Sequence, residues 1–214
     1  PAGTHIGSRV VVDKPITLRS VNGPEVTVIR GIPVRNEFAV RCAWVTNGAS
    51  VSGFTFSQGG TDVVGSEADR YGAGVYAQGA DAVFSNCVFD TCMAERGAGI
   101  YGGTVYDSEL AGNEGEIGGG ACASVLVRCD LTSNMATNSG GGAASSLLRE
   151  CTLQSNVALL GGGTRECDLY NCLLIGNVAM DSGGGVYMGD VFNSTLYGNM
   201  ALLDLPDAGN VVNH

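Results

Sequence analysis

Three consecutive stretches of the chain repeat one pattern: GGGACASVLVRCDLTSNMATNS (118–139), GGGAASSLLRECTLQSNVALL (140–160) and GGGTRECDLYNCLLIGNVAMDS (161–182). Further glycine-containing units begin at Gly72, Gly97 and Gly183, so the period is 21 to 22 residues after Gly97. The units align in columns of leucine, of cysteine or serine, and of alanine. The most regular column is Asn113, Asn134, Asn156, Asn177 and Asn199. Self-similarity at a fixed period of this length is typical of solenoid proteins.

The spacing within each unit selects the kind of solenoid. The leucine and the small residue two positions before it have the period-two spacing of one strand face, and no unit contains a helical run of apolar positions. One unit cannot bury its own apolar face, whereas stacked coils form a continuous core. We therefore predict an all-β, right-handed, single-stranded parallel β-helix of roughly eight coils. The asparagines are expected to form a ladder at a tight turn, where Asn tolerates the left-handed conformation.

A single β-helix domain is expected over residues 1–214. Residues 1–71 form less regular coils with an insertion at 59–71, and residues 72–214 carry the regular repeats. The segment 210–214 (NVVNH) echoes 190–194 (DVFNS), so we expect the sequence to stop in mid-repeat.

Charge and hydropathy exclude two classes of partner. The net charge is −10, from 21 acidic and 11 basic residues, and no basic stripe suited to nucleic acid is visible. No stretch approaches the ~20 apolar residues of a membrane span.

The units resemble the parallel β-helix repeats of the pectin-lyase-like superfamily. The motif GGGVY (183–187), followed by LYGN (196–199), is also similar to polymorphic outer-membrane protein repeats, although leucine mostly replaces their phenylalanine. The resemblance implies a secreted or cell-surface protein of bacterial type. Because this fold hosts lyases, hydrolases, adhesins and passive spacers, the resemblance is specific for fold rather than for activity.

Two catalytic patterns can be compared with the residues. Hydrolases of this fold need clustered aspartates, but the acids here are scattered over different columns. Lyases need a Lys or Arg base together with a cation or arginine that neutralises a uronate. The best available cluster is Arg128, Arg149 and Arg165, although adjacent glutamates also fit ordinary solvated faces.

Two further sets of residues are candidates for binding. Tyr76, Tyr101 and Tyr187 share an outward column and could stack on sugar rings of a polysaccharide or a cell-surface glycan, although an exposed tyrosine needs no ligand. Asp62, Glu67 and Asp69 in the insertion could hold calcium, but they lack the spacing of known calcium loops, and a solvated loop is the simpler interpretation. No other cofactor is indicated.

Cysteines form a column of their own: Cys87, Cys129, Cys151 and Cys172. Neighbours about 4.8 Å apart could form disulfides. Serine replaces cysteine in two units, however, so a buried ladder of reduced thiols is the preferred interpretation.

The leading hypothesis is a non-enzymatic surface or secreted module, adhesin-like and acting as a stalk. The alternative is a polysaccharide lyase or another carbohydrate-active enzyme that uses the face of Arg128 and Arg149. A cleft along that face, walled by the insertion, would favour the enzyme.

Overall fold

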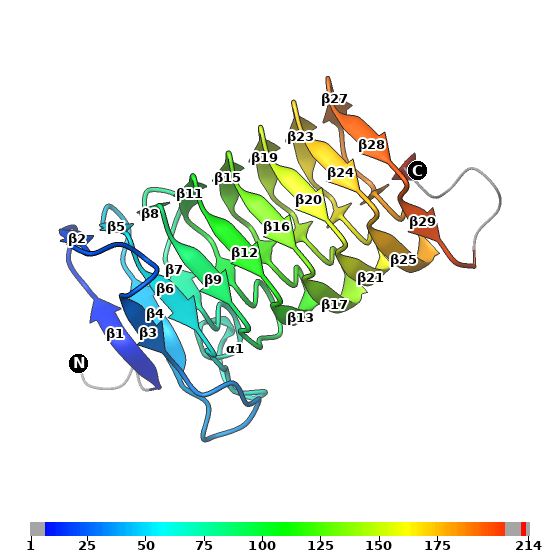
Figure 1. Ribbon diagram of the computed structural model, residues 1–214. Helices are drawn as coiled ribbons and strands as arrows, with labels where there is room; N and C mark the ends of the chain where they lie inside the picture. The colour runs from blue at the N-terminus through cyan, green and yellow to red at the C-terminus, as the bar shows by residue number, and fades with distance from the viewer. Residues whose placement is uncertain (1–6, 204–210, 213–214) are drawn as a thin grey trace.

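The computed structural model describes residues 7–203 and 211–212. The chain winds into a right-handed parallel β-helix, with its coils stacked along one axis from the N-terminus to the C-terminus (Figure 1). The solenoid makes about six turns rather than eight. The irregular N-terminal coils nevertheless add strands, so that three of the sheets reach eight or nine strands.

Four parallel sheets run along the axis. The first contains β1 (Ser8–Val12), β4 (Arg41–Val45), β7 (Val75–Ala77), β10 (Ile100–Tyr101), β14 (Ala121–Cys122), β18 (Ala143–Ala144), β22 (Thr164–Arg165), β26 (Val186–Tyr187) and β30 (Val211–Val212). The second contains β2 (Thr17–Arg19), β5 (Ser50–Ser52), β8 (Val83–Ser85), β11 (Thr104–Tyr106), β15 (Val125–Val127), β19 (Leu147–Arg149), β23 (Asp168–Tyr170) and β27 (Val191–Phe192).

The other two sheets complete each coil. The third contains β3 (Val28–Arg30), β6 (Thr55–Ser57), β9 (Val88–Asp90), β12 (Glu109–Ala111), β16 (Asp130–Thr132), β20 (Thr152–Gln154), β24 (Leu173–Ile175) and β28 (Thr195–Tyr197). The fourth contains β13 (Glu114–Ile117), β17 (Met135–Ser139), β21 (Val157–Leu160), β25 (Val178–Ser182) and β29 (Met200–Ala201). The only helix in the described chain is the four-residue α1 (Glu67–Arg70), and no described helix is long and apolar enough to span a membrane.

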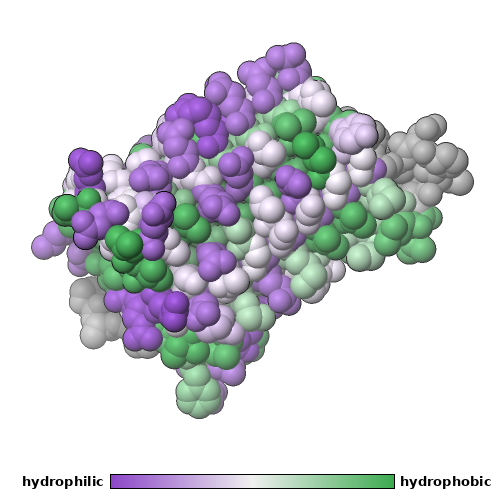
Figure 2. All heavy atoms as spheres, in the orientation of Figure 1, coloured by the Kyte–Doolittle hydropathy of each residue, from purple (hydrophilic) through white to green (hydrophobic). Residues whose placement is uncertain are grey.

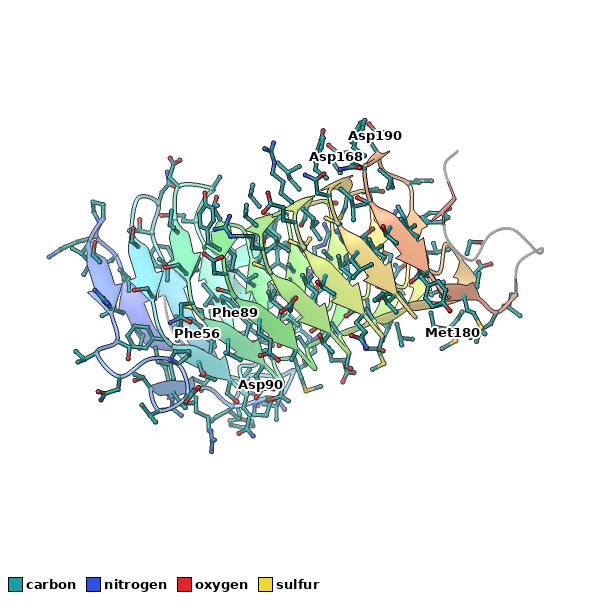
Figure 3. All side chains as sticks on the ribbon, turned by 45° about the horizontal axis from the view of Figure 1, so that its top comes forward. Phe56, Phe89, Asp90, Asp168, Met180 and Asp190 are labelled. Carbon is teal, nitrogen blue, oxygen red and sulfur yellow. The ribbon has the colours of Figure 1, made fainter. Side chains whose placement is uncertain are left out.

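The interior is filled by the predicted columns. Leu110, Leu131, Leu153 and Leu174 pair in register across β12, β16, β20 and β24, and all are fully buried. Phenylalanines take the same column in the earlier coils, where the rings of Phe56 and Phe89 stack with centroids 5.3 Å apart inside the coil (Figure 3). The apolar core is therefore continuous along the described chain.

The asparagine column forms the predicted hydrogen-bonded ladder. In each coil, the side-chain oxygen of one asparagine accepts the backbone and side-chain N–H of the asparagine in the preceding coil, as Asn134 donates to Asn156 at 2.9 and 3.1 Å. The prediction that these asparagines adopt the left-handed conformation was wrong. The positive φ belongs to the residue before each asparagine, such as Ser133 or Gly176. Asparagine is needed at this position because its amide satisfies buried backbone groups.

Glycines allow the fourth sheet to fold tightly onto the first. The first glycine of each triplet has positive φ, for example +66° at Gly140. A Cβ on the next residue, Gly141, would lie 2.5 Å from the carbonyl oxygen of Val157. Only glycine permits this approach of two backbones.

The outer face of the fourth sheet is apolar towards the C-terminal end. Its exposed side chains include Met135, Leu159, Met180 and Met200, which are 42 to 54% exposed. Figure 2 shows green side chains gathered at this end of the rod, and the labelled Met180 projects outward from β25 in Figure 3.

Candidate functional site

The three candidate arginines do not form one cluster. Arg149 lies at the end of β19 in the second sheet, and Arg128 occupies the following corner one coil earlier, with φ of +53°. Arg165 lies in β22, in the first sheet. Arg128 and Arg149 are therefore neighbours on adjacent coils, as predicted, and Arg165 lies further round the next coil, on a different sheet, because the chain turns a corner between their columns.

Each of the three arginines has its own partner. Arg128 binds Asp107 through two hydrogen bonds of 2.7 and 3.0 Å, and this contact lowers the pKa of the Asp107 carboxyl. The guanidinium of Arg149 lies 5.3 Å from the ring centroid of Tyr170. Arg165 donates to Ser139 at 2.8 Å and pairs with Glu166 at 3.1 Å.

The surface around Arg128 is a small hollow rather than a walled cleft. Its volume is about 230 Å³, and carboxylates of Asp107, Glu109 and Asp130 line it. The 59–71 insertion does not contribute to this hollow. A cleft walled by the insertion, which is the feature that would favour an enzyme on this face, is not found among the described residues.

The tyrosines share an outward column of the first sheet, as expected. Register places Tyr76 beside Tyr101 and Tyr187 beside Arg165, while Cys122 and Ala144 fill the column between these two pairs. Tyr187 is thus several coils away from the other two tyrosines.

The faces of Tyr76 and Tyr101 are covered by protein. Their rings stack 5.6 Å apart at 11°, Arg41 lies 5.5 Å from the Tyr76 centroid, and Tyr71 lies 4.9 Å from the Tyr101 centroid. Burial raises the pKa of both half-buried tyrosines. Sugar rings stack on open aromatic faces, so these two tyrosines offer only their edges.

The acidic residues of the insertion serve mainly its own turns. Oδ1 of Asp62 accepts the N–H groups of Val63 and Val64, at 2.6 and 3.3 Å. Oδ2 of Asp69 accepts from the N–H and hydroxyl of Ser66 at the start of α1, and the hydroxyl contact lowers the pKa of Asp69. Within the described residues, no group of three or more His, Cys, Asp or Glu side chains is placed to hold a metal ion.

Arg41, which the sequence patterns did not single out, holds the insertion against the first sheet. Its guanidinium is buried and donates to the carbonyl oxygens of Gly72 at 2.8 Å, of Tyr71 at 2.9 Å, and of Ala68. Burial lowers the pKa of Arg41 to about 10. The size of this residue was a signal in the sequence. The strand register aligns Arg41 with Ala73, Ala98 and glycines in other coils, so Arg41 is the one long side chain in a column of small residues.

A cavity of about 320 Å³ lies between this insertion and the loop that precedes β4. Asn36, Glu37, Arg41, Asp62 and Asp69 contribute polar groups to it, and Val64 and Ala39 contribute apolar ones. Asp62 and Asp69 were singled out in the sequence, together with Glu67, as a possible calcium site, although a solvated loop was the preferred interpretation. The cavity was missed because neither loop belongs to the repeat.

The cysteine column is present as predicted. All eight cysteines of the chain are buried free thiols. Burial raises the pKa of Cys122 to about 11 and that of Cys167 to about 12, and a hydrogen bond with Cys129 raises the pKa of Cys151 to about 12. These three thiols are neutral at physiological pH, and all eight cysteines serve as small core side chains.

Comparisons with protein-family models, with curated proteins and with solved structures gave no match. The site is therefore interpreted from its own geometry.

Proposed function

We propose that the chain is a non-enzymatic module of a secreted or cell-surface protein of bacterial type, in which the β-helix acts as an adhesin-like stalk and presents a carbohydrate-binding site. The proposal includes kinship with the pectin-lyase-like superfamily and with polymorphic outer-membrane repeats, which rests on the repeat motifs alone.

One observation carries the proposal: the regular coils use their conspicuous residues for stacking. The asparagines satisfy one another from Asn113 to Asn199, and each link is a pair of buried hydrogen bonds near 3 Å. A solenoid in which every coil is bonded to the next at the same place is a stiff rod, because bending would stretch these buried bonds on one side.

The charged residues support the same interpretation. The charge of Arg128 is neutralised by Asp107, and the guanidinium of Arg149 lies over the ring of Tyr170. A lyase needs a base that can reach the substrate and a free cationic group that neutralises the uronate, so these pairings weigh against catalysis on this face.

The test combines cleavage with adhesion. Purified protein is incubated with polyuronates and with neutral polysaccharides while unsaturated products and new reducing ends are measured. In parallel, a non-adherent host that displays the chain is applied to surfaces coated with the same polymers. We expect adhesion to a coated surface without cleavage. Cleavage that Arg149→Ala abolishes would establish the enzyme instead, and absence of adhesion to every coating would refute the adhesive role.

A further inference from the structure

We propose that the cavity between the loop at 32–40 and the insertion at 59–71 binds a single neutral sugar residue, such as the end of a glycan chain. This inference rests on the proposed function, because it names the place and the ligand class of the binding site. The site differs from the tyrosine column, whose residues were the candidates for sugar stacking in the sequence.

The first argument is that the walls of this cavity are fixed in place. Arg41 binds three carbonyl oxygens at the end of the insertion. The Thr61 hydroxyl donates to the carbonyl of Arg70 at 2.9 Å, and Arg70 pairs with Glu95 at 2.5 Å on the next coil. A site whose walls are already ordered loses little entropy when a ligand binds.

The second argument is the set of hydrogen-bonding atoms that the loops leave available. Asp62 and Asp69 each use one carboxylate oxygen in a turn, and their other oxygens make no hydrogen bond within the described chain. Asn36 uses its oxygen to accept the N–H of Phe38 at 2.9 Å, while its NH₂ donates to no described residue. The residues that line the cavity therefore carry both free acceptors and a free donor, which are the two kinds of group that sugar hydroxyls bond to.

The third argument concerns charge. Glu37, Asp62 and Asp69 surround a cavity whose wall also contains the buried guanidinium of Arg41. An anion would meet three carboxylates, and the Arg41 guanidinium that could balance them is already bonded to three carbonyl oxygens. No group of three or more His, Cys, Asp or Glu side chains among the described residues is placed to hold a metal ion. A neutral polyol can still bond to charged groups, which gives stronger hydrogen bonds than neutral partners do.

Size and apolar surface agree with this ligand class. The volume of about 320 Å³ is at the lower end of the range of about 300–1,000 Å³ for small-molecule sites. Val64 and Ala39 provide apolar wall for the C–H groups of a sugar ring. Phe38, on the same loop as Asn36 and Glu37, is 70% exposed.

The test uses two isosteric changes in the full chain. Asp62→Asn keeps the oxygen that caps the turn and changes the other oxygen into a donor, and Asn36→Asp makes the converse change. Asp190→Asn, on the projecting corner shown in Figure 3, is the matched control. Binding of methyl hexosides, N-acetylhexosamine, glucosamine, glucuronate and calcium chloride is measured by titration calorimetry and by ligand-observed NMR, with circular dichroism as the check on folding.

We expect a methyl hexoside or N-acetylhexosamine to bind, and we expect each loop change to weaken it about tenfold or more while Asp190→Asn has no effect. Binding of glucosamine, glucuronate or calcium alone would overturn the assignment, as would equal sugar affinity in all four proteins. If Asp62→Asn leaves adhesion to glycan surfaces intact, this site is refuted and the proposed function stands. Sugar binding by a chain that does not adhere would refute the adhesive role and leave the site in place.

Discussion

Replacing Asn156 by alanine should interrupt the buried ladder at its centre. The Asn156 side chain makes four hydrogen bonds: it accepts from the backbone N–H and the amide of Asn134, at 2.9 and 3.1 Å, and it donates to Leu131 O and Asn177 Oδ1, both at 2.9 Å. In the alanine variant the backbone N–H of Asn134, which is fully buried in the parent protein, loses its partner.

The size of the effect follows from these contacts. A buried hydrogen bond contributes about 1 kcal/mol net, so the four together contribute about 4 kcal/mol, and the orphaned N–H adds to this cost. Asn138→Ala removes the same atoms from an exposed position on β17 and should change the free energy of unfolding by about 0.5 kcal/mol or less.

Two measurements test the prediction. Urea unfolding, followed by circular dichroism, compares the midpoints of the two variants with that of the parent. Because a solenoid can open coil by coil, hydrogen exchange locates the effect, and the amide of Asn134 should exchange faster in Asn156→Ala but not in Asn138→Ala. Equal midpoints for the two variants, or unchanged protection at Asn134, would refute the account of the ladder.

Three other outcomes follow from the same structure. Gly142→Ala places a Cβ 2.7 Å from the backbone oxygen of Gly163 and should lower the urea midpoint well below that of Gly115→Ala, where φ is likewise not positive and the nearest atom lies 3.4 Å away; equal midpoints would contradict the packing argument. At pH 8 the folded protein should leave all eight thiols unreacted with a disulfide reagent, because they are buried, and urea should expose them; rapid labelling without urea would contradict the core assignment. Arg128→Ala should raise the lowered pKa of Asp107 towards its ordinary value, as measured by carbon NMR. In the parent protein the ion pair between Arg128 and Asp107 is complete above the ordinary pKa range of a carboxyl, and it is lost as the pH falls through the lowered pKa of Asp107. Because this pair is exposed to solvent, Arg128→Ala should leave the urea midpoint unchanged.

The fold could be predicted because its determinants repeat. A leucine two positions after a small residue identifies the inward face of a strand. One short segment with this spacing could be assigned to a strand or to another structure, but the recurrence of the spacing in several coils settles the assignment. The ladder was predictable for the same reason. The left-handed residue beside it was not, because Ser133, Ser155 and Gly176 share no side chain that signals their common conformation.

The binding candidates were predicted less well, for physical reasons. The prediction that Tyr76 and Tyr101 share a column was correct. Their rings lie one coil apart and stack on each other, so that each ring covers a face of the other. The cavity depends on contacts between two loops outside the repeat, and periodicity carries no information about such contacts. Arg41 connects the insertion to the first sheet through backbone carbonyls, and its long side chain in a column of small residues was the one sign of this contact in the sequence.

Because every link of the asparagine ladder is the same, coils can be added to or removed from the rod as whole units. Each coil passes to its successor the same acceptor that it receives from its predecessor, as the links Asn134–Asn156 and Asn156–Asn177 illustrate. A gene duplication that copies one whole unit therefore joins two matching surfaces, whereas a single inserted residue turns a strand's inward side chains outward. The length of the rod therefore changes in steps of one coil, at little cost to the protein. Such changes leave the loops at 32–40 and 59–71 unaltered.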